Sequence, residues 1–278
     1  MMEMTKKGKL GSLRLGPEIQ RKIQDRRKLI GLLRDSVEKQ RFQVWYQPVY
    51  DCLRGELCGA EALVRLQDAE GRILPPGAFI PLAEETGIID AISWFMLENV
   101  CRFLAEHPDL PLQSVSVNLS MEQFQDPQLE PRIFGILERY GIGPERIKIE
   151  ITERVIVSDM ERVKEVMGNL AGRGIGFYLD DFGTGYSNFS GVLHLPFECI
   201  KLDRSLFLTI TENERDYHVV DTMIKLFHQL GFSIVAEGLE TEEQCAVLRS
   251  MKTDRIQGYY YAKPMPESEI MGFFREKG

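Results

Sequence analysis

The sequence has no run of about 18 apolar residues, which is the length that a membrane-spanning helix requires. Its first ten residues are basic but lack the apolar core of a signal peptide. Glycine (24 residues) and proline (13 residues) are too few for a collagen-like or low-complexity chain. The 278 residues, 44% of them hydrophobic, therefore predict a globular protein with one large domain or two modest ones.

Cysteine is also scarce. The chain has five cysteines, an odd number, and no C-x-x-C pair that would indicate a zinc or redox site. We therefore expect a reduced, cytoplasmic protein. At Cys199 a small buried hydrophobe on a strand is expected, although a reactive thiol is the alternative.

Acidic side chains are few only at the beginning of the chain. The first 42 residues carry 12 basic and 5 acidic side chains, a net charge of +7, so the rest of the chain carries −15 of the total of −8. A surface of that charge repels nucleic acid and phosphate-bearing ligands unless metal cations intervene. We expect no nucleic-acid partner.

Residues 18–40 have apolar side chains at helical spacing, which predicts a helix that leads into the main domain. We divide the chain into a flexible tail (1–17), this N-terminal helix (18–41) and one domain (42–278). The helix is interpreted as a solvated connection. The alternative is a contact surface for an upstream sensor or partner protein, or for an acidic membrane surface.

From residue 43 onward, short apolar strands alternate with amphipathic helices in units of about 30 residues. Eight strands in roughly 240 residues predict an α/β fold, a (β/α)8 barrel of the TIM type, with a doubly wound open sheet as the alternative. The strands are predicted near 44–49, 59–66, 114–118, 147–151, 176–180, 199–202, 233–236 and 255–259, and helices between them at 92–105, 129–140, 159–173, 216–230 and 242–251.

Acidic residues gather at the ends of these predicted strands, where barrel enzymes carry their catalytic groups. The carboxylates are Glu61, Glu150, Asp180, Asp181 and Glu237. In one ring they would repel each other unless their pKa values rise or cations neutralise them. Oxygen ligands and Asn118 favour magnesium, manganese or calcium. None of the four histidines lies at a predicted strand end, so a histidine zinc site is not expected.

Neighbouring side chains refine this interpretation. Asp180 and Asp181 cannot both point inward from a regular strand, so the chain must turn there, and two adjacent carboxylates could serve two metal ions in phosphoryl transfer. Arg65 shares a strand face with Glu61 and suits a phosphate group, and Lys201 would add positive charge near the reaction. The alternative is a barrel whose acidic ring binds a ligand without turning it over.

The chain resembles the EAL domain family of bacterial cyclic di-GMP phosphodiesterases from about Arg26 to Pro266. The resemblance rests on nine motifs in order, and the tripeptide Glu61-Ala62-Leu63 alone would carry no weight. The motifs are Tyr46–Pro48, Glu61–Arg65, Phe79–Glu84, Val117–Ser120, Glu150–Glu153, Asp180–Ser187, Lys201–Ser205, Ala236–Thr241 and Gln257–Tyr259.

The resemblance implies a barrel whose first strand runs antiparallel to the others, and hydrolysis of cyclic di-GMP to linear pGpG with Mg²⁺ or Mn²⁺ at a two-metal site. It implies that Lys201 and Glu237 activate the water. It also implies that Glu153 holds the loop after the fifth strand. The implied metal ligands are Glu61, Asn118, Glu150, Asp180, Asp181 and Glu237, and the implied substrate contacts are Gln47, Leu63, Arg65 and Gln257.

The resemblance further implies a homodimer through the loop 181–190 and the helix after it. Degenerate relatives bind the dinucleotide without cleaving it and usually lack metal ligands, whereas this chain keeps them. No Gly-Gly-Asp/Glu-Glu-Phe motif of a diguanylate cyclase is present. The main alternative function is a catalytically weak cyclic di-GMP receptor.

Overall fold

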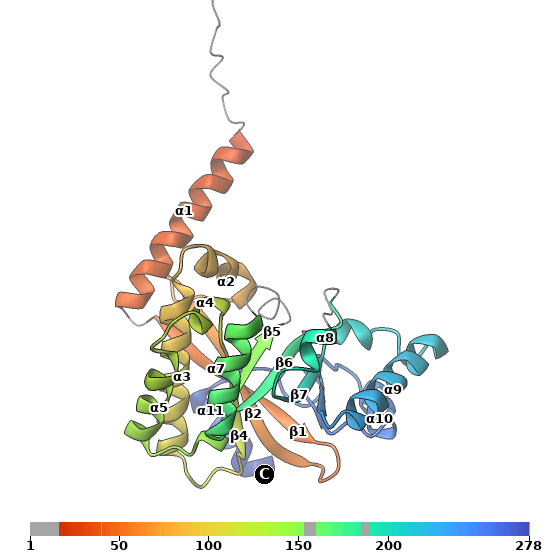
Figure 1. Ribbon diagram of the computed structural model, residues 1–278. Coiled ribbons are helices and arrows are strands. Elements are labelled where there is room, and N and C mark those ends of the chain that lie inside the picture. The colour runs from red at the N-terminus through yellow and green to blue at the C-terminus, as the bar shows by residue number, and fades with distance from the viewer. Residues whose placement is uncertain (1–16, 40, 153–159, 185–188, 278) are drawn as a thin grey trace, which may run out of the picture.

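The computed structural model describes residues 17–39, 41–152, 160–184 and 189–277. Within these residues eight strands close into a barrel with helices outside it (Figure 1). The barrel strands are β1 (Phe42–Asp51), β2 (Glu56–Gln67), β4 (Ser114–Asn118), β5 (Ile147–Thr152), β6 (Gly176–Phe182), β7 (Phe197–Leu202), β8 (Ser233–Ala236) and β9 (Arg255–Ile256).

The order of the strands confirms the predicted barrel and excludes the open sheet. Strands β2, β4, β5, β6, β7, β8 and β9 are parallel neighbours in that order, and β1 closes the ring by pairing antiparallel with both β2 and β9. The first strand is therefore antiparallel to the rest, as expected. Two short strands, β3 (Ile73–Leu74) and β10 (Met265–Pro266), pair with β2 and β1.

Helices cover the outside of the barrel. They are α2 (Pro76–Glu85), α3 (Ile89–Glu106), α4 (Met121–Phe124), α5 (Leu129–Tyr140), α7 (Met160–Gly172), α8 (Phe189–Val192), α9 (Glu214–Gln229), α10 (Glu242–Ser250) and α11 (Glu267–Lys277). Two 3-10 turns, η1 (Pro144–Arg146) and η2 (Arg204–Leu206), precede β5 and follow β7. The predicted helices at 92–105, 129–140, 159–173, 216–230 and 242–251 are confirmed within a few residues, whereas α2 and α11 were not anticipated.

Strand β5 shows why the lumen of this barrel is polar. Ile147, Ile149 and Ile151 are fully buried in the main hydrophobic core, beneath the helices. The alternate residues Lys148 and Glu150 lie on the other face, because side chains along a strand alternate between its two faces. The apolar core therefore lies between sheet and helices, and the strands can carry charged groups inward.

The predicted end of the last strand is wrong. We expected a strand from Arg255 to Tyr259, but β9 ends at Ile256 and Gln257 is already outside it. A side chain at Gly258 would lie 2.2 Å from the carbonyl oxygen of Leu239, so glycine lets the chain turn against that backbone.

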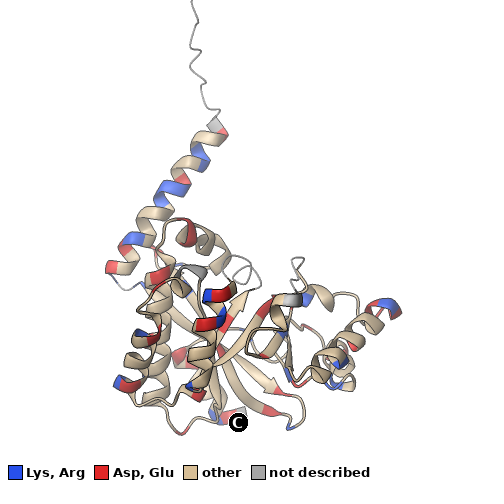
Figure 2. Ribbon diagram, in the orientation of Figure 1, with Lys and Arg blue, Asp and Glu red and all other residues tan. Residues whose placement is uncertain are grey.

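The N-terminal helix α1 (Pro17–Glu38) projects from the barrel (Figure 1) and carries most of its Lys and Arg on the projecting part (Figure 2). Its C-terminal half packs on the domain through buried Leu33 and Ser36, and Arg26 pairs with Glu85 of α2. In the described part of the chain, no helix combines the length and apolar character needed to cross a membrane.

Candidate functional site

The amino group of Lys201, inside the barrel, lies at the centre of four carboxylates. Each carboxylate comes from a different strand or strand end: β2, β5, β6 and the residue after β8. The distances from Lys201 Nζ are 3.2 Å to Glu61, 2.6 Å to Glu150, 2.9 Å to Asp180 and 2.7 Å to Glu237. We call this cluster the upper lumen. The structure brings together four of the five predicted strand-end carboxylates around a lysine that is 2% exposed.

Three amides hold the upper lumen from its sides. Asn118 donates to Glu61 (3.3 Å) and to Glu150 (3.4 Å). Gln257 donates to Glu61 (2.7 Å) and to the side-chain oxygen of Gln47 (3.1 Å). Gln47 and Gln257 are both buried, so Gln257 holds Glu61 directly and Gln47 acts on Glu61 only through Gln257.

The carboxylates do not share the same charge state in the protein without cations. Burial favours the neutral form of Glu61, but attraction to Lys201 and the hydrogen bond from Gln257 outweigh it and lower its pKa. Burial and the neighbouring charge of Glu61 raise the pKa of Glu150 well above its usual range. Burial also raises the pKa of Glu237 to about 8, although Lys201 opposes the shift. The cluster therefore retains protons at neutral pH.

Lys201 stays charged despite its burial. Loss of water disfavours an ammonium ion, but the carboxylates of Asp180, Glu150, Glu237 and Glu61 raise its pKa well above the ordinary value. One fixed cation thus faces four carboxylates, which leaves an excess of negative charge that divalent cations could neutralise.

Asp181 lies beside the cluster in the strained conformation that its neighbour requires. Its φ of 57° is in the left-handed region, and the pairing of β6 with β7 is irregular between Leu179 and Phe182. This irregularity confirms that the strand departs from regular geometry at Asp180-Asp181. Partial loss of water around its carboxyl and the neighbouring charge of Asp180 raise the pKa of Asp181 to about 6.

The donor atoms fit a divalent cation. One oxygen each of Asp180, Asp181 and Glu237 can lie within 4.8 Å of one another. The oxygens Oδ1 of Asp180 and Oε1 of Glu237 lie 2.9 Å and 2.7 Å from Lys201 Nζ, the same ammonium that Glu61 and Glu150 share. An ammonium has only three N–H donors, so it cannot serve four carboxylates fully, and carboxylate oxygens suit Mg²⁺ or Mn²⁺.

Three further residues were predicted at the site: Arg65 and Leu63, which are placed on β2, and Glu153, which lies outside the described residues. Arg65 lies on β2, partly buried, with its guanidinium 5.3 Å from the ring centre of Trp45, and Leu63 is partly buried on the same strand face. Glu153 falls outside the described residues, as do residues 185–188 of the loop expected at a dimer interface.

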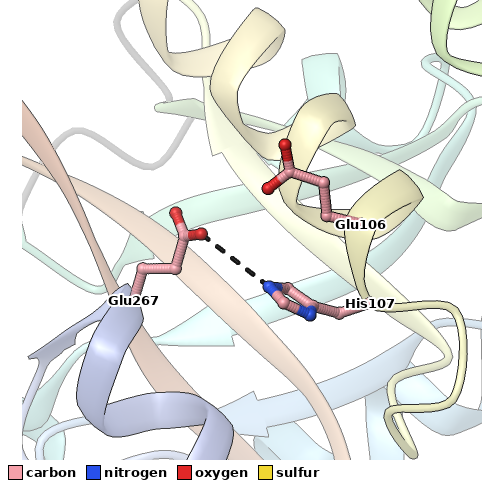
Figure 3. Close-up of side chains that lie close together, drawn as sticks. All are labelled: Glu106, His107 and Glu267. Atoms are coloured by element: carbon pink, nitrogen blue, oxygen red, sulfur yellow. Dashed lines mark ion pairs between the residues drawn. The ribbon is translucent and has the colours of Figure 1, made fainter.

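A second group with metal-ligand residue types lies on the outside of the barrel. Figure 3 shows Glu106 and His107, at the end of α3, beside Glu267 at the start of α11, with His107 Nε2 3.8 Å from Glu267. Arg102 pairs with Glu106 (2.5 Å) and with Glu267 (2.6 Å). A guanidinium therefore already neutralises these carboxylates, and the group is an ion-pair cluster between two helices.

The sequence analysis missed the inward residues one layer below the carboxylates. Tyr178 is two residues before Asp180 on β6 and shares its strand face, and Arg255 begins β9 two residues before Gln257. The same period of two that placed Arg65 beside Glu61 is the signal that could have identified them.

Comparison with known proteins identifies the family of this chain. Residues 31–264 match the family model described as the EAL domain. The chain is 31% identical over 248 residues to the Cyclic di-GMP phosphodiesterase NbdA of Pseudomonas aeruginosa, covering 87% of this chain and 31% of that protein. It spans about a third of the length of the curated relatives it matches.

Two solved structures have the same fold. The structure titled PaMucR Phosphodiesterase, c-di-GMP complex matches with a TM-score of 0.81 and 31% identity, covering 87% of this chain and 99% of that one. The EAL domain of FimX from Pseudomonas aeruginosa bound to c-di-GMP matches with a TM-score of 0.79 and 26% identity, covering 85% and 96%. The chain belongs to the EAL domain family.

Proposed function

We propose that this domain hydrolyses cyclic di-GMP to linear pGpG with the help of two divalent cations. The observation that carries the proposal is the upper lumen itself, where carboxylates from four strands surround one buried lysine whose three N–H donors cannot serve them all. The relatives whose names state this substrate support the choice of ligand.

The residues that would hold the cations share one property, a side-chain oxygen carried on a barrel strand or directly after one. They are Glu61, Asn118, Glu150, Asp180, Asp181 and Glu237. When bound, Mg²⁺ or Mn²⁺ supplies a Lewis acid for the phosphodiester and lowers the pKa of water. The acidic site needs this positive charge before it can accept an anionic dinucleotide.

Glu237 and Lys201 carry the proton and charge chemistry in this proposal. Glu237, whose pKa is raised to about 8 in the metal-free protein, would lose its own proton when cations bind, and the resulting carboxylate accepts the proton of the attacking water. Lys201 lies 2.7 Å from Glu237 and remains charged, so it orients that carboxylate and stabilises negative charge on the phosphate.

Four residues are proposed to bind and orient the dinucleotide. Arg65 offers a guanidinium to a phosphate group, with Trp45 beneath it, and Leu63 adds an apolar contact on the same strand face. Gln257 donates hydrogen bonds to Glu61 and to Gln47, so both glutamines lie next to the upper lumen. Glu153 is assigned to hold the loop after β6 by the resemblance alone.

The remaining assignments concern the whole protein. We propose that 42–278 is the catalytic domain, that 18–41 connects it to an upstream sensor or partner, and that 1–17 is a flexible tail. A homodimer through residues 181–190 and the helix after them, and a cytoplasmic location, complete the proposal. A hydrophobic stripe on the projecting α1, with Ile19 49% and Ile23 37% exposed, supports a contact role for that helix.

The test is a turnover assay with cyclic di-GMP and Mg²⁺ or Mn²⁺, with the product identified by mass. The wild-type chain is expected to form pGpG, and Glu61→Ala and Glu237→Gln are expected to lower turnover at least about a thousandfold. Glu198→Gln is the matched control, because Glu198 is an exposed carboxylate whose partner is Lys148.

The possible results distinguish a phosphodiesterase from a receptor and test the assigned residues. Undiminished turnover in both variants would contradict the assigned roles. Tight binding of cyclic di-GMP without any pGpG, in the presence of either cation, would replace the phosphodiesterase by a receptor. Hydrolysis of other cyclic dinucleotides at a higher rate would change the substrate but not the chemistry.

A further inference from the structure

The barrel has a cavity beneath the upper lumen. Its wall includes Gly59, Ser114 and Ser116, at inward positions of β2 and β4, and it reaches upward to Glu150 and Lys201. Barrels of this type usually fill such positions with bulky branched side chains. At Gly59 a Cβ atom would lie 2.9 Å from the carbonyl oxygen of Ser114, so the approach of the two strands excludes a side chain there. We call this region the lower lumen.

A guanidinium without an acidic partner lines the lower lumen. Arg255 is partly buried and donates to the hydroxyl oxygen of Tyr178 at 2.9 Å. Among the described residues no carboxylate lies within ion-pair distance of Arg255. The neighbouring cation, Lys148, is different because it pairs with Glu198 at 2.8 Å. Buried charges are ordinarily paired, so the charge of Arg255 calls for an anion.

The hydroxyl of Tyr178 adds a second donor. Its oxygen accepts the hydrogen bond from Arg255, which leaves its own hydrogen available. Burial also raises the pKa of Tyr178, so the hydroxyl stays protonated at neutral pH. Guanidinium, phenol and the hydroxyls of Ser114 and Ser116 together offer several donors to one small space.

The size of the space limits its occupant. The centre of a water-sized sphere can reach about 20 Å³ of the cavity, which is enough for one or two particles of that size. A chloride ion is only slightly larger than water.

We propose that the lower lumen binds a water-sized monovalent anion, chloride under ordinary conditions, between Arg255 and Tyr178. The anion neutralises Arg255 and fills the space that Gly59 and the two serines leave. Gln113, which is exposed and lines the same cavity, marks the side from which the ion enters.

Anomalous diffraction tests the site directly. The full chain is crystallised with sodium bromide in place of chloride, and data are collected at the bromine absorption edge. We expect a bromide peak within hydrogen-bond distance of the Arg255 guanidinium and the Tyr178 hydroxyl. Surface bromide peaks with only water in the lower lumen would overturn the proposal.

A second experiment, in solution, tests the site without crystals. Unfolding temperature is measured in sodium chloride and in sodium gluconate at equal ionic strength, because gluconate is too large for the cavity. The wild type is expected to unfold about 2–4 °C higher in chloride at ten times its Kd. Arg255→Gln and Tyr178→Phe should lose this difference, and Arg204→Gln, an exposed arginine paired with Glu240, should keep it. An equal chloride effect in Arg255→Gln would contradict the site.

Discussion

The upper and lower lumen are built on the same strands, two residues apart, and differ in almost every other respect. The upper lumen gathers four carboxylates around one lysine, whereas the lower lumen contains one arginine, a tyrosine and several small side chains. The upper lumen therefore holds several charged groups close together, whereas the lower lumen holds one. We propose that the upper lumen binds cations and that the lower lumen binds an anion.

This difference shows that the apolar core of the barrel and its polar lumen lie on opposite faces of the same strands. Because the apolar core lies between strands and helices, the inward face of each strand can carry polar and charged side chains. Lys201 and Arg255 illustrate the two outcomes. Lys201 is surrounded by acidic partners and holds them in place, while Arg255 touches only the neutral Tyr178 among the contacts described.

The largest expected effect comes from removing the buried cation. Lys201→Met in the protein without metal should lower the free energy of unfolding by about 3–5 kcal/mol, because four carboxylates, of which Glu61 and Glu150 are buried, lose the ammonium that they share. Lys148→Met is the matched control, since Lys148 pairs with a half-exposed carboxylate and should cost about 1 kcal/mol or less. Urea denaturation measures both.

Added Mn²⁺ sharpens that test. It should restore part of the stability of Lys201→Met, because cations replace the missing charge, and should leave Lys148→Met unchanged. Equal losses in the two variants would show that the upper lumen is not an electrostatic cluster that depends on Lys201.

The second prediction concerns pH. The pKa of Glu237 is raised to about 8 and that of Asp181 to about 6, so both carboxyls bind protons that a cation must displace. Affinity for Mn²⁺ should therefore fall as pH drops from 8 to 6, by up to about tenfold per pH unit, and fall more steeply below 6. Calorimetry in two buffers of different ionisation enthalpy measures the protons released.

The same shifts set the stability of the metal-free protein. A carboxyl whose pKa is raised on folding contributes stability below its unfolded value, about 4.3 for Glu, and this contribution is lost as pH rises through the folded value. Metal-free protein should thus become less stable between about pH 4.3 and 8, and Mn²⁺ should reduce that loss. No proton release on Mn²⁺ binding would contradict the charge states assigned to the upper lumen.

The smallest expected effect lies in the lower lumen. Gly59→Ala places a Cβ atom 2.9 Å from the carbonyl oxygen of Ser114, so the two strands must move apart, at a cost of about 1–3 kcal/mol. Gly135→Ala, in the exposed middle of α5 with no atom within 4 Å, should stabilise by about 0.5–1 kcal/mol. Opposite signs in urea denaturation are expected, and a neutral Gly59→Ala would show that β2 and β4 do not need this close approach.

The fold could be predicted because its signals are local. Alternation of strands and amphipathic helices is repeated along the chain, and it indicated eight strands and five of the helices. The antiparallel β1 could not be derived from periodicity, since a strand carries no local mark of its direction, and it came from the resemblance. The end of β9 was mispredicted because Gly258 turns against Leu239, a contact between distant segments.

The site was predicted less evenly. Carboxylates at strand ends converge in any closed barrel, so Glu61, Glu150, Asp180 and Glu237 could be grouped from sequence. The different protonation states of these carboxyls could not be predicted from sequence, because they depend on burial and on distances to Lys201. Arg255 was missed for a similar reason, since an arginine without a partner is recognised only when its surroundings are known.

The measurement that tests the central claim most directly is the rate of pGpG formation by metal-stripped protein before and after Mn²⁺ is restored. We expect no product without the cation, recovery of turnover when it is added, and no recovery in Asp180→Asn, which replaces a carboxylate of the candidate metal group by a neutral amide. Formation of pGpG by stripped wild-type protein, or full recovery in Asp180→Asn, would contradict the assignment of the upper lumen as a cation-dependent hydrolytic centre.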